Sequence, residues 1–217
     1  MLERLRVGIS EVSTGKSFPE TASFLSNMYF FSMDPFKPTS EQIQAAWGKT
    51  VPDVIAPDLK ILFCGINPSL YTGAVGHHFA RPGNRFWPSL HKAGITPRLF
   101  SPFEEEKLLS LGYGITNLVA RATAAASDIK RAEFQAGAVD LEKKSIQFNP
   151  TVLAFMGVEA YRLAFCRPKA KVGKQEEKLA NSTIWVLPNP SGLNAHYQID
   201  DYANMLREVK QFAEGDK

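Results

Sequence analysis

The chain has 217 residues, of which 44% are hydrophobic and 22% charged, and its formal net charge at pH 7 is +3. This length and composition are typical of a soluble globular protein with one α/β domain. No run of 18 apolar residues occurs, so no transmembrane helix is expected, and the small positive charge permits a polyanionic partner without requiring one.

The cysteine and histidine patterns do not favour an iron–sulfur cluster or a structural zinc site. Cys64 and Cys166 are far apart in the chain, no CxxC occurs, and the four histidines lack a spacing such as HxxxH. Two cysteines cannot hold a four-cysteine iron–sulfur cluster, and a structural zinc is not expected either. Both thiols lie in apolar segments, which favours a reducing, cytoplasmic location over a disulfide framework. The N-terminus lacks the apolar segment of a secretory signal.

Residues 1–37 show no clear hydrophobic period, and we expect an N-terminal extension that is partly mobile. Within it, the apolar segment 24–33 is interpreted as a strand or a docking arm, and a true start at Met28 or Met33 stays open. Residues 38–217 are predicted to form a single domain.

Strand and helix signals alternate along this domain. Thr39 and Gln42 form the pattern of a capping box, which predicts a short helix through Trp47 that stops at Gly48. The remaining expected elements are strands over 59–65, 113–119 and 151–157, a strand with its following loop over 182–192, helices over 84–94, 127–148, 158–165 and 199–213, and a loop over 71–83.

The expected strands are apolar on both faces, which predicts a parallel sheet with helices on each side. Sites in open parallel sheets lie outside the carboxyl ends of the strands. Two strand ends here carry Asn-Pro loops, "GINPSL" over 65–70 and "PNPSGLN" over 188–194. A single Asn-Pro is often only a turn, but two of them after two apolar strands predict one crevice flanked by both loops.

Three motifs in this order resemble the mismatch-specific uracil/thymine DNA glycosylases (the Mug/TDG family): "GINPSL", "GHHFARPGNRFW" over 76–87 and "WVLPNPSGLN" over 185–194. The resemblance implies an α/β fold that is a three-layer α/β/α sandwich with a mainly parallel central sheet. It also implies a monomeric enzyme that uses no metal or organic cofactor. Its partner would be double-stranded DNA with a mispaired or damaged pyrimidine, in which it hydrolyses the N-glycosidic bond of uracil or thymine opposite guanine.

The resemblance also implies roles for individual residues. Asn67 would position the attacking water. The base pocket would be formed by Ile66, Ser69, His78, Phe79, Asn117 and Asn189. The loop that enters the duplex would consist of Ser191, Gly192, Leu193 and Asn194.

Physical chemistry agrees with these residue types. A base in a duplex must be flipped out before it can be cleaved, and flipping costs least for a mispair. An apolar side chain such as Leu193 can fill the vacated stack, and Gly192 allows a close backbone approach. Phe79 would stack on the flipped pyrimidine, which is worth about 1–3 kcal/mol. The amide of Asn67 can orient a water but cannot deprotonate it as a carboxylate would, so slow turnover is expected.

Two positions depart from the family pattern. Ser69 stands where the family often has glycine, and its side chain is expected to narrow the pocket near the base C5 and to disfavour thymine. After the wedge, Ala195 and His196 stand where bacterial relatives often place an arginine, which weakens the expected grip on the guanine strand.

Other interpretations stay open at this point. Asn117 could be a buried structural residue, His78 a solvent-facing loop residue, and Leu193 a loop residue folded onto the core. Arg81 and Arg85 could contact phosphates, and residues 104–106 are expected to be a solvated helix start. The basic segment 167–174 is more often a solvated loop than a phosphate contact. Rival functions are a glycosylase that also acts on single strands and a catalytically weak module that senses mispairs.

Overall fold

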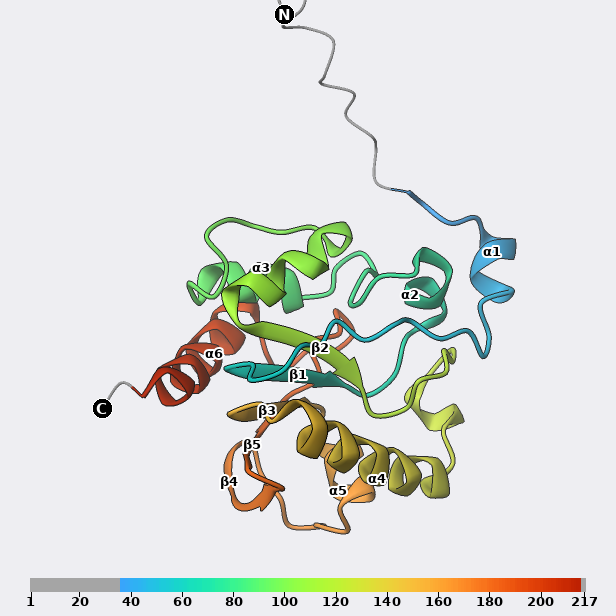
Figure 1. The fold of residues 1–217 in the computed structure, drawn as a ribbon. Helices are drawn as coiled ribbons and strands as arrows, with labels where there is room; N and C mark the ends of the chain where they lie inside the picture. The colour runs from blue at the N-terminus through green and yellow to red at the C-terminus, as the bar shows by residue number, and fades with distance from the viewer. Residues whose placement is uncertain (1–35, 216–217) are drawn as a thin grey trace, which may run out of the picture. The chain divides into compact units, whose positions relative to one another are not determined.

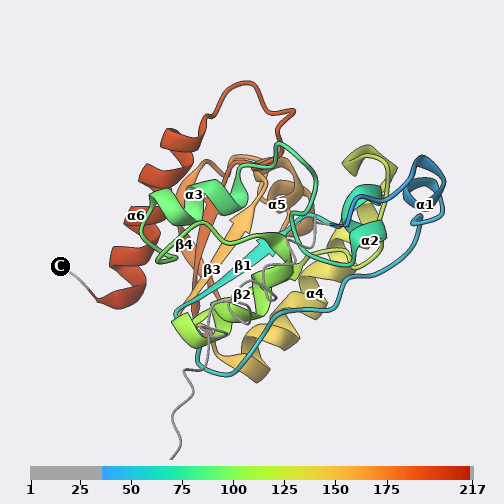
Figure 2. The same cartoon turned by 90° about the horizontal axis from the view of Figure 1, so that it is seen from above.

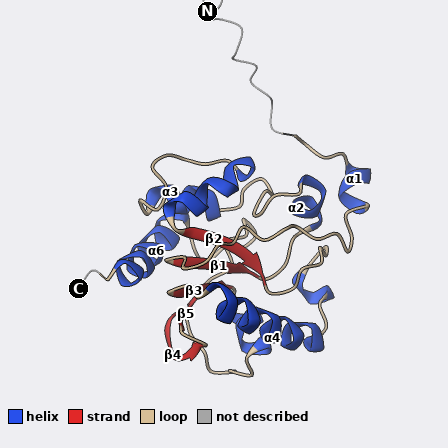
Figure 3. Cartoon of the chain, viewed as in Figure 1, coloured by secondary structure: helices blue, strands red, loops and turns tan. Residues whose placement is uncertain are grey.

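The computed structural model describes residues 36–215, so the expectations for 24–33 and for Met28 and Met33 lie outside the described residues. Residues from Lys37 onward form one compact unit. Its elements, coloured in chain order in Figure 1 and by type in Figure 3, are α1 (Ser40–Gln44), β1 (Ile61–Gly65), α2 (Leu70–Val75), α3 (Phe86–Lys92), η1 (Pro102–Leu111), β2 (Tyr113–Asn117), η2 (Ala126–Asp128), α4 (Arg131–Phe148), β3 (Val152–Met156), α5 (Val158–Ala164), β4 (Gly173–Leu179), β5 (Ser182–Leu187) and α6 (Ile199–Glu214).

The sheet confirms the predicted α/β fold class. Its strand order is β2-β1-β3-β5-β4, and the first four strands are parallel while β4 pairs antiparallel with β5 at the edge. All four parallel strands are almost entirely buried because both of their faces are covered, as expected for a sheet of this kind. The parallel strands therefore end at one common edge, where their following loops meet.

Alternating side chains of β1 divide the interior into two hydrophobic clusters. Ile61 and Phe63 face the cluster that contains α3 and α6 residues, whereas Leu62 and Cys64 face the cluster that contains α4 and α5 residues. Figure 1 shows α3 and α6 on one side of the sheet and α4 and α5 on the other. The result is the predicted three-layer sandwich, in which period-two alternation assigns each strand residue to one layer.

One expectation about local structure is wrong, and one strand was not expected from the sequence. Residues 71–83 are not all loop, because Ser69 caps the short helix α2 by accepting a hydrogen bond from the Thr72 backbone. The sequence did not predict this helix because Gly73 and Gly76 are typical of a loop. Gly76 ends the helix in a left-handed conformation. Residues 167–172 form a mostly exposed loop, as expected for the segment 167–174. This loop leads into β4, which the sequence did not predict and whose alternating exposed and half-buried residues are typical of a protected edge strand.

Two other observations concern the helices of the unit. The capping box of Thr39 and Gln42 is present, and the regular turns of α1 end at Gln44, before the turn that reaches Gly48. Within residues 36–215, no helix combines the length and the hydrophobicity needed to cross a bilayer.

Candidate active site

A cavity of about 420 Å³ lies at the carboxyl edge of the parallel strands. The loops after β1, β2 and β5 and the segment before α3 supply its walls. The two Asn-Pro loops therefore do flank one crevice, although β3 separates their strands. The cavity is lined by ten of the predicted site residues: Ile66, Asn67, Ser69, His78, Phe79, Asn117, Asn189, Ser191, Leu193 and Asn194.

The backbone after β1 fixes the position of Asn67. The N–H groups of Leu118 and Val119 donate to the Gly65 and Ile66 carbonyls at 2.9 Å each, so the segment after β2 runs beside the segment after β1. Thr123 N–H donates to the Pro68 carbonyl at 3.2 Å. These bonds hold the Asn-Pro pair against a second strand end rather than leaving it as a free turn.

The amide nitrogen of Asn67 points into a nest of acceptors. Asn67 Nδ2 lies 3.1 Å from the Pro68 carbonyl, 3.1 Å from the Arg121 carbonyl and 2.8 Å from Thr123 Oγ1. An amide NH₂ group donates and cannot accept, so these contacts distinguish its nitrogen from its oxygen. Within residues 36–215, no donor contacts Asn67 Oδ1, which leaves this oxygen as an acceptor for a molecule in the cavity.

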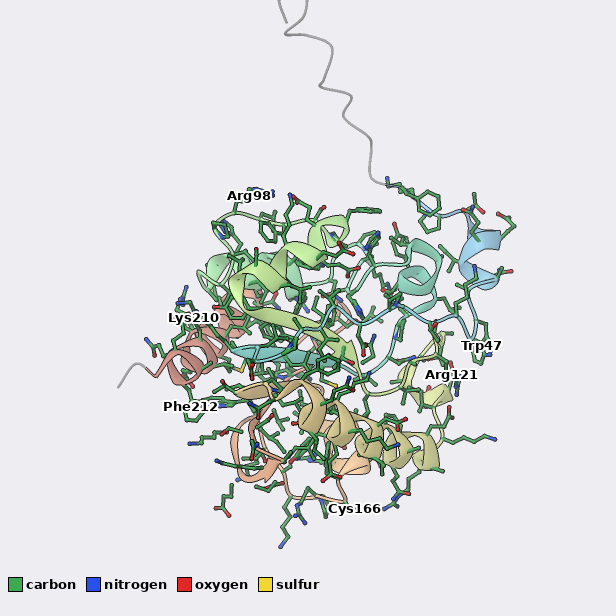
Figure 4. All side chains as sticks on the ribbon, in the orientation of Figure 1. Trp47, Arg98, Arg121, Cys166, Lys210 and Phe212 are labelled. Carbon is green, nitrogen blue, oxygen red and sulfur yellow. The ribbon has the colours of Figure 1, made fainter. Side chains whose placement is uncertain are left out.

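Thr123 is a site residue that the sequence reasoning missed. Its side chain is buried, and its Oγ1 donates to the Ala125 carbonyl at 2.8 Å, which leaves the oxygen lone pairs free to accept from Asn67. In the sequence it stands among alanines and small polar residues with no motif around it. Its neighbour Arg121 contributes only its carbonyl to the nest, because the Arg121 guanidinium bonds Glu133 and lies beside Trp47 (Figure 4).

Phe79 forms one wall of the cavity. Its ring stacks on Phe86 with a centroid separation of 4.0 Å and an interplanar angle of 22°, and its backbone φ is +53°. A left-handed conformation at phenylalanine is uncommon and is retained only when the surroundings enforce it. Gly65 makes room for this arrangement, since a Cβ there would lie 3.4 Å from Phe79 Cζ and 2.5 Å from Asn117 Oδ1.

His78 is buried in the cavity wall and is not a solvent-facing loop residue. Its Nε2 lies 2.9 Å from the Pro52 carbonyl, and its Nδ1 lies 3.3 Å from Asn117 Nδ2. A nitrogen beside a carbonyl must carry the proton, so Nδ1 accepts from the Asn117 amide. This pairing turns Asn117 Oδ1 away from His78 and toward the end of β1, where it is an acceptor at the cavity.

Glu105 stabilises His77 and His78 through its carboxylate. The expectation of a solvated segment over 104–106 is wrong for this residue, which is 5% exposed. Its two carboxylate oxygens contact His77 Nδ1 at 2.7 Å and accept from the His78 backbone N–H at 2.7 Å. Glu105 therefore stabilises the loop that carries Phe79 from inside the protein, although in the sequence it is the middle one of three consecutive glutamates.

The loop after β5 presents Leu193 to solvent. Leu193 is 76% exposed, so it is not folded onto the core. Asn189 uses its Oδ1 to accept from the Ser191 N–H at 3.0 Å, and its carbonyl accepts from Asn194 Nδ2 at 3.1 Å. Asn189 thus shapes the loop from inside, while Ser191 and Asn194 line the cavity mouth.

Comparison with known proteins identifies the family. Residues 52–212 match the model of the Uracil DNA glycosylase superfamily, which is most of the chain. The chain belongs to the uracil DNA glycosylase superfamily. A solution NMR structure of a candidate uracil DNA glycosylase from Methanosarcina acetivorans has a similar fold, with a TM-score of 0.53 and 19% identity over 75% of this chain and 98% of that chain.

Superfamily membership agrees with the fold and with DNA as the polymer on which such proteins act. The matched range 52–212 includes both Asn-Pro loops, the Phe79 segment and Thr123. The finer resemblance to the Mug/TDG family and the roles of the individual residues stay predictions. The positions of those residues around one cavity are what the structure adds to them.

One expected outcome concerns pH. Burial is the largest influence on the pKa of His78 and lowers it below the ordinary 6.5, although Glu105 and Asp53 oppose this shift. The unfolded chain therefore binds a proton more readily than the folded protein, and the His78 contribution to stability is lost as pH falls through 6.5 and below.

The measurement is urea unfolding at about pH 7.5 and about pH 5.5 for the wild type and for His78→Gln. We expect the acid-induced loss of unfolding free energy to be smaller in His78→Gln. The comparison removes the effects of His77 and the other histidines, which both proteins share. An equal loss in the two proteins would show that burial of His78 does not oppose its protonation.

Proposed function

We propose that this superfamily member hydrolyses the N-glycosidic bond of uracil, and more slowly of thymine, mispaired with guanine in double-stranded DNA, as the resemblance to the Mug/TDG family implies. The product is an abasic site for base excision repair. The observation that carries the proposal is the Asn67 amide, whose nitrogen is bound by three acceptors while its oxygen is left to the cavity.

The base enters the cavity by flipping. A G:U or G:T wobble pair is weaker than a Watson–Crick pair, so the few kcal/mol needed for flipping are reduced at these sites. Leu193, exposed beside the cavity mouth, has the apolar shape needed to occupy the vacated stack. Phe79 offers its ring as a stacking surface, held by Phe86 behind it.

Asn117 provides a basis for selecting uracil. Uracil and thymine carry an N3–H donor, whereas cytosine has an acceptor at N3. His78 holds the Asn117 amide with its oxygen free, and an amide oxygen accepts from N3–H but repels the N3 lone pair of cytosine. A site that leaves a buried acceptor unpaired discriminates strongly against the wrong base.

The reaction needs a positioned water rather than a strong base. The water oxygen forms a bond to C1′ as the bond from C1′ to N1 breaks, and the electron pair of that bond leaves on the pyrimidine, which is a fair anion. The water proton passes to solvent or to the departing base. Asn67 Oδ1 accepts a hydrogen bond from the water and sets its direction, and holding the reactants in line supplies the rate enhancement.

Ser69 is expected to set the preference for uracil over thymine. It lines the cavity, and its hydroxyl is held in place by capping α2 through Thr72. Ser69→Gly removes the side chain, and glycine at an N-cap costs only a few tenths of a kcal/mol. We therefore expect Ser69→Gly to raise G:T excision relative to G:U excision, measured as single-turnover rate constants. An unchanged ratio would show that Ser69 does not limit access of the thymine methyl group.

The proposal as a whole is tested with labelled duplexes that contain G:U, G:T or A:U, together with single-stranded uracil DNA. Abasic products are revealed by alkaline cleavage. We expect the order G:U, then G:T, then A:U. Equal excision from single strands would replace mismatch specificity with a broader uracil glycosylase. Mismatch binding without any excision would replace the enzyme with a mispair sensor.

A further inference from the structure

The loop that carries Leu193 is fastened to the start of α3 by one residue, Arg85. The Arg85 backbone N–H donates to the Pro190 carbonyl at 2.9 Å. Its guanidinium Nη1 donates to the Ser191 carbonyl at 2.8 Å and to the Asn194 carbonyl at 2.9 Å. A single guanidinium nitrogen therefore bridges the two carbonyls on either side of Gly192 and Leu193. Figure 2 shows the segment before α6 beside the segment that leads into α3.

A second contact brings the same two segments together. A Cβ built on Gly192 would lie 2.6 Å from the Gly83 carbonyl oxygen, which is closer than real Cβ contacts. Gly192 therefore serves a backbone approach within the protein, in addition to the approach to DNA expected from the sequence. Two residues apart, Gly83 and Arg85 hold the loop from one side.

Arg85 binds the protein itself through one of its side-chain nitrogens, and a phosphate contact through its other donors stays a prediction. Its Nη1 donors are directed at protein carbonyls, and no carboxylate within residues 36–215 forms an ion pair with it. Hydrogen bonds from a charged donor to a carbonyl are stronger than neutral ones, and a guanidinium keeps its charge at every physiological pH.

Arg85 also stands next to the residue that supports the base pocket. Phe86 follows it directly, is 1% exposed, and carries Phe79 stacked on its ring. Because Phe86 is fixed in the core, the start of α3 is a rigid point from which both structures are held. The Phe79 ring is held through Phe86, and the Leu193 loop is held through Arg85.

We propose that Arg85 is a positioning residue that keeps the Leu193 loop in the conformation that enters the duplex and couples this loop to the Phe79 wall. The inference rests on the proposed function, in which Leu193 fills the vacated stack. An exposed loop that had to be ordered during binding would lose affinity and rate to conformational entropy. Arg85 removes that cost by ordering the loop in the free protein.

The first test measures the loop directly and does not need activity. Hydrogen exchange followed by mass spectrometry reports the Asn194 N–H, which donates to the Ser191 carbonyl at 2.9 Å. We expect exchange in the peptide that contains it to be about 10-fold faster in Arg85→Gln, because a charged hydrogen-bond donor is lost. Arg207→Gln is the matched control, since Arg207 donates to the Lys92 carbonyl at the other end of α3.

The second test is a double-mutant cycle between Arg85→Gln and Leu193→Ala. Single-turnover excision of uracil from a G:U duplex is measured for both single variants and the double variant. We expect each single variant to be about 10-fold slower and the double variant to be no slower than the slower single variant, because residues that act through one another are not additive. Arg207→Gln should retain the wild-type rate. Arg85→Lys keeps a charged donor and guards against a folding defect in Arg85→Gln.

The outcomes separate the inference from the proposed function. Unchanged exchange in Arg85→Gln overturns the inference, whether or not the protein excises uracil. Faster exchange with multiplicative rate losses also overturns it, because Arg85 would then act without Leu193. Faster exchange with non-additive losses supports it. A wild-type protein that excises nothing refutes the proposed function, and with it the coupling to excision, even if the loop loosens.

Discussion

Asn67→Ala is expected to slow single-turnover excision of uracil from a G:U duplex by about 10²-fold or more, because the water loses the group that aims it at C1′. The wild-type amide is fixed through its nitrogen by the Pro68 and Arg121 carbonyls and Thr123 Oγ1, which holds its oxygen toward the cavity. The flipped base should still be held by Phe79 and Asn117, which contact other parts of the cavity.

The control for this prediction is duplex affinity. Asn67→Ala should bind a G:U duplex nearly as tightly as the wild type, since the loop with Leu193 is intact. The Asn67 NH₂ group shares its two hydrogens among these three acceptors, and its loss also reduces stability by an amount on the order of 1–3 kcal/mol, so thermal unfolding is measured alongside. A folded, DNA-binding Asn67→Ala protein with the wild-type rate would remove Asn67 from the chemistry.

Thr123→Val is expected to lower the excision rate constant by about 10-fold while leaving duplex affinity unchanged, because valine cannot accept from Asn67. Thr123 Oγ1 is the nearest of the three acceptors around Asn67 Nδ2, at 2.8 Å. Without it, the amide keeps only its contacts to the Pro68 and Arg121 carbonyls, is held less firmly, and presents its nitrogen to the water for part of the time. An amide nitrogen donates and would turn the water away from C1′.

Thr123→Ser keeps the hydroxyl and should restore most of the rate. Thr96→Val is a matched control for the change of shape, because Thr96 is buried in the core and its Oγ1 has no hydrogen-bond partner among residues 36–215. If Thr123→Val and Thr96→Val behave alike, the hydroxyl of Thr123 does not orient Asn67. If Thr123→Ser is as slow as Thr123→Val, packing rather than hydrogen bonding explains the loss.

The sequence predicted the parts of the fold that depend on continuous apolar runs. β1, β2, β3 and β5 are buried on both faces, so each reads as a short hydrophobic segment that ends at glycine or a polar loop. β4 escaped because an edge strand alternates charged and half-buried residues and resembles a basic loop. α2 was not predicted because a helix this short that contains glycine shows no detectable hydrophobic period.

The site shows the same division. Asn67 and Phe79 could be predicted from the sequence because they stand in motifs that carry a family resemblance. The roles inferred for Thr123, Glu105 and Arg85 depend on contacts with residues far away in the sequence. For example, Arg85 bonds Ser191, which lies 106 positions further along the chain. A local motif cannot reveal such contacts, because they exist only once the sheet has brought the loops together.

The most direct test of the account is the release of free uracil from a G:U duplex in ¹⁸O-labelled water, followed by mass spectrometry of the base and of the abasic strand. The account predicts free uracil in amounts that match the abasic strand, with one labelled oxygen at C1′ of the sugar, and loss of both products in Asn67→Ala. A duplex that is bound but keeps its uracil, or a base released by Asn67→Ala as fast as by the wild type, would contradict it.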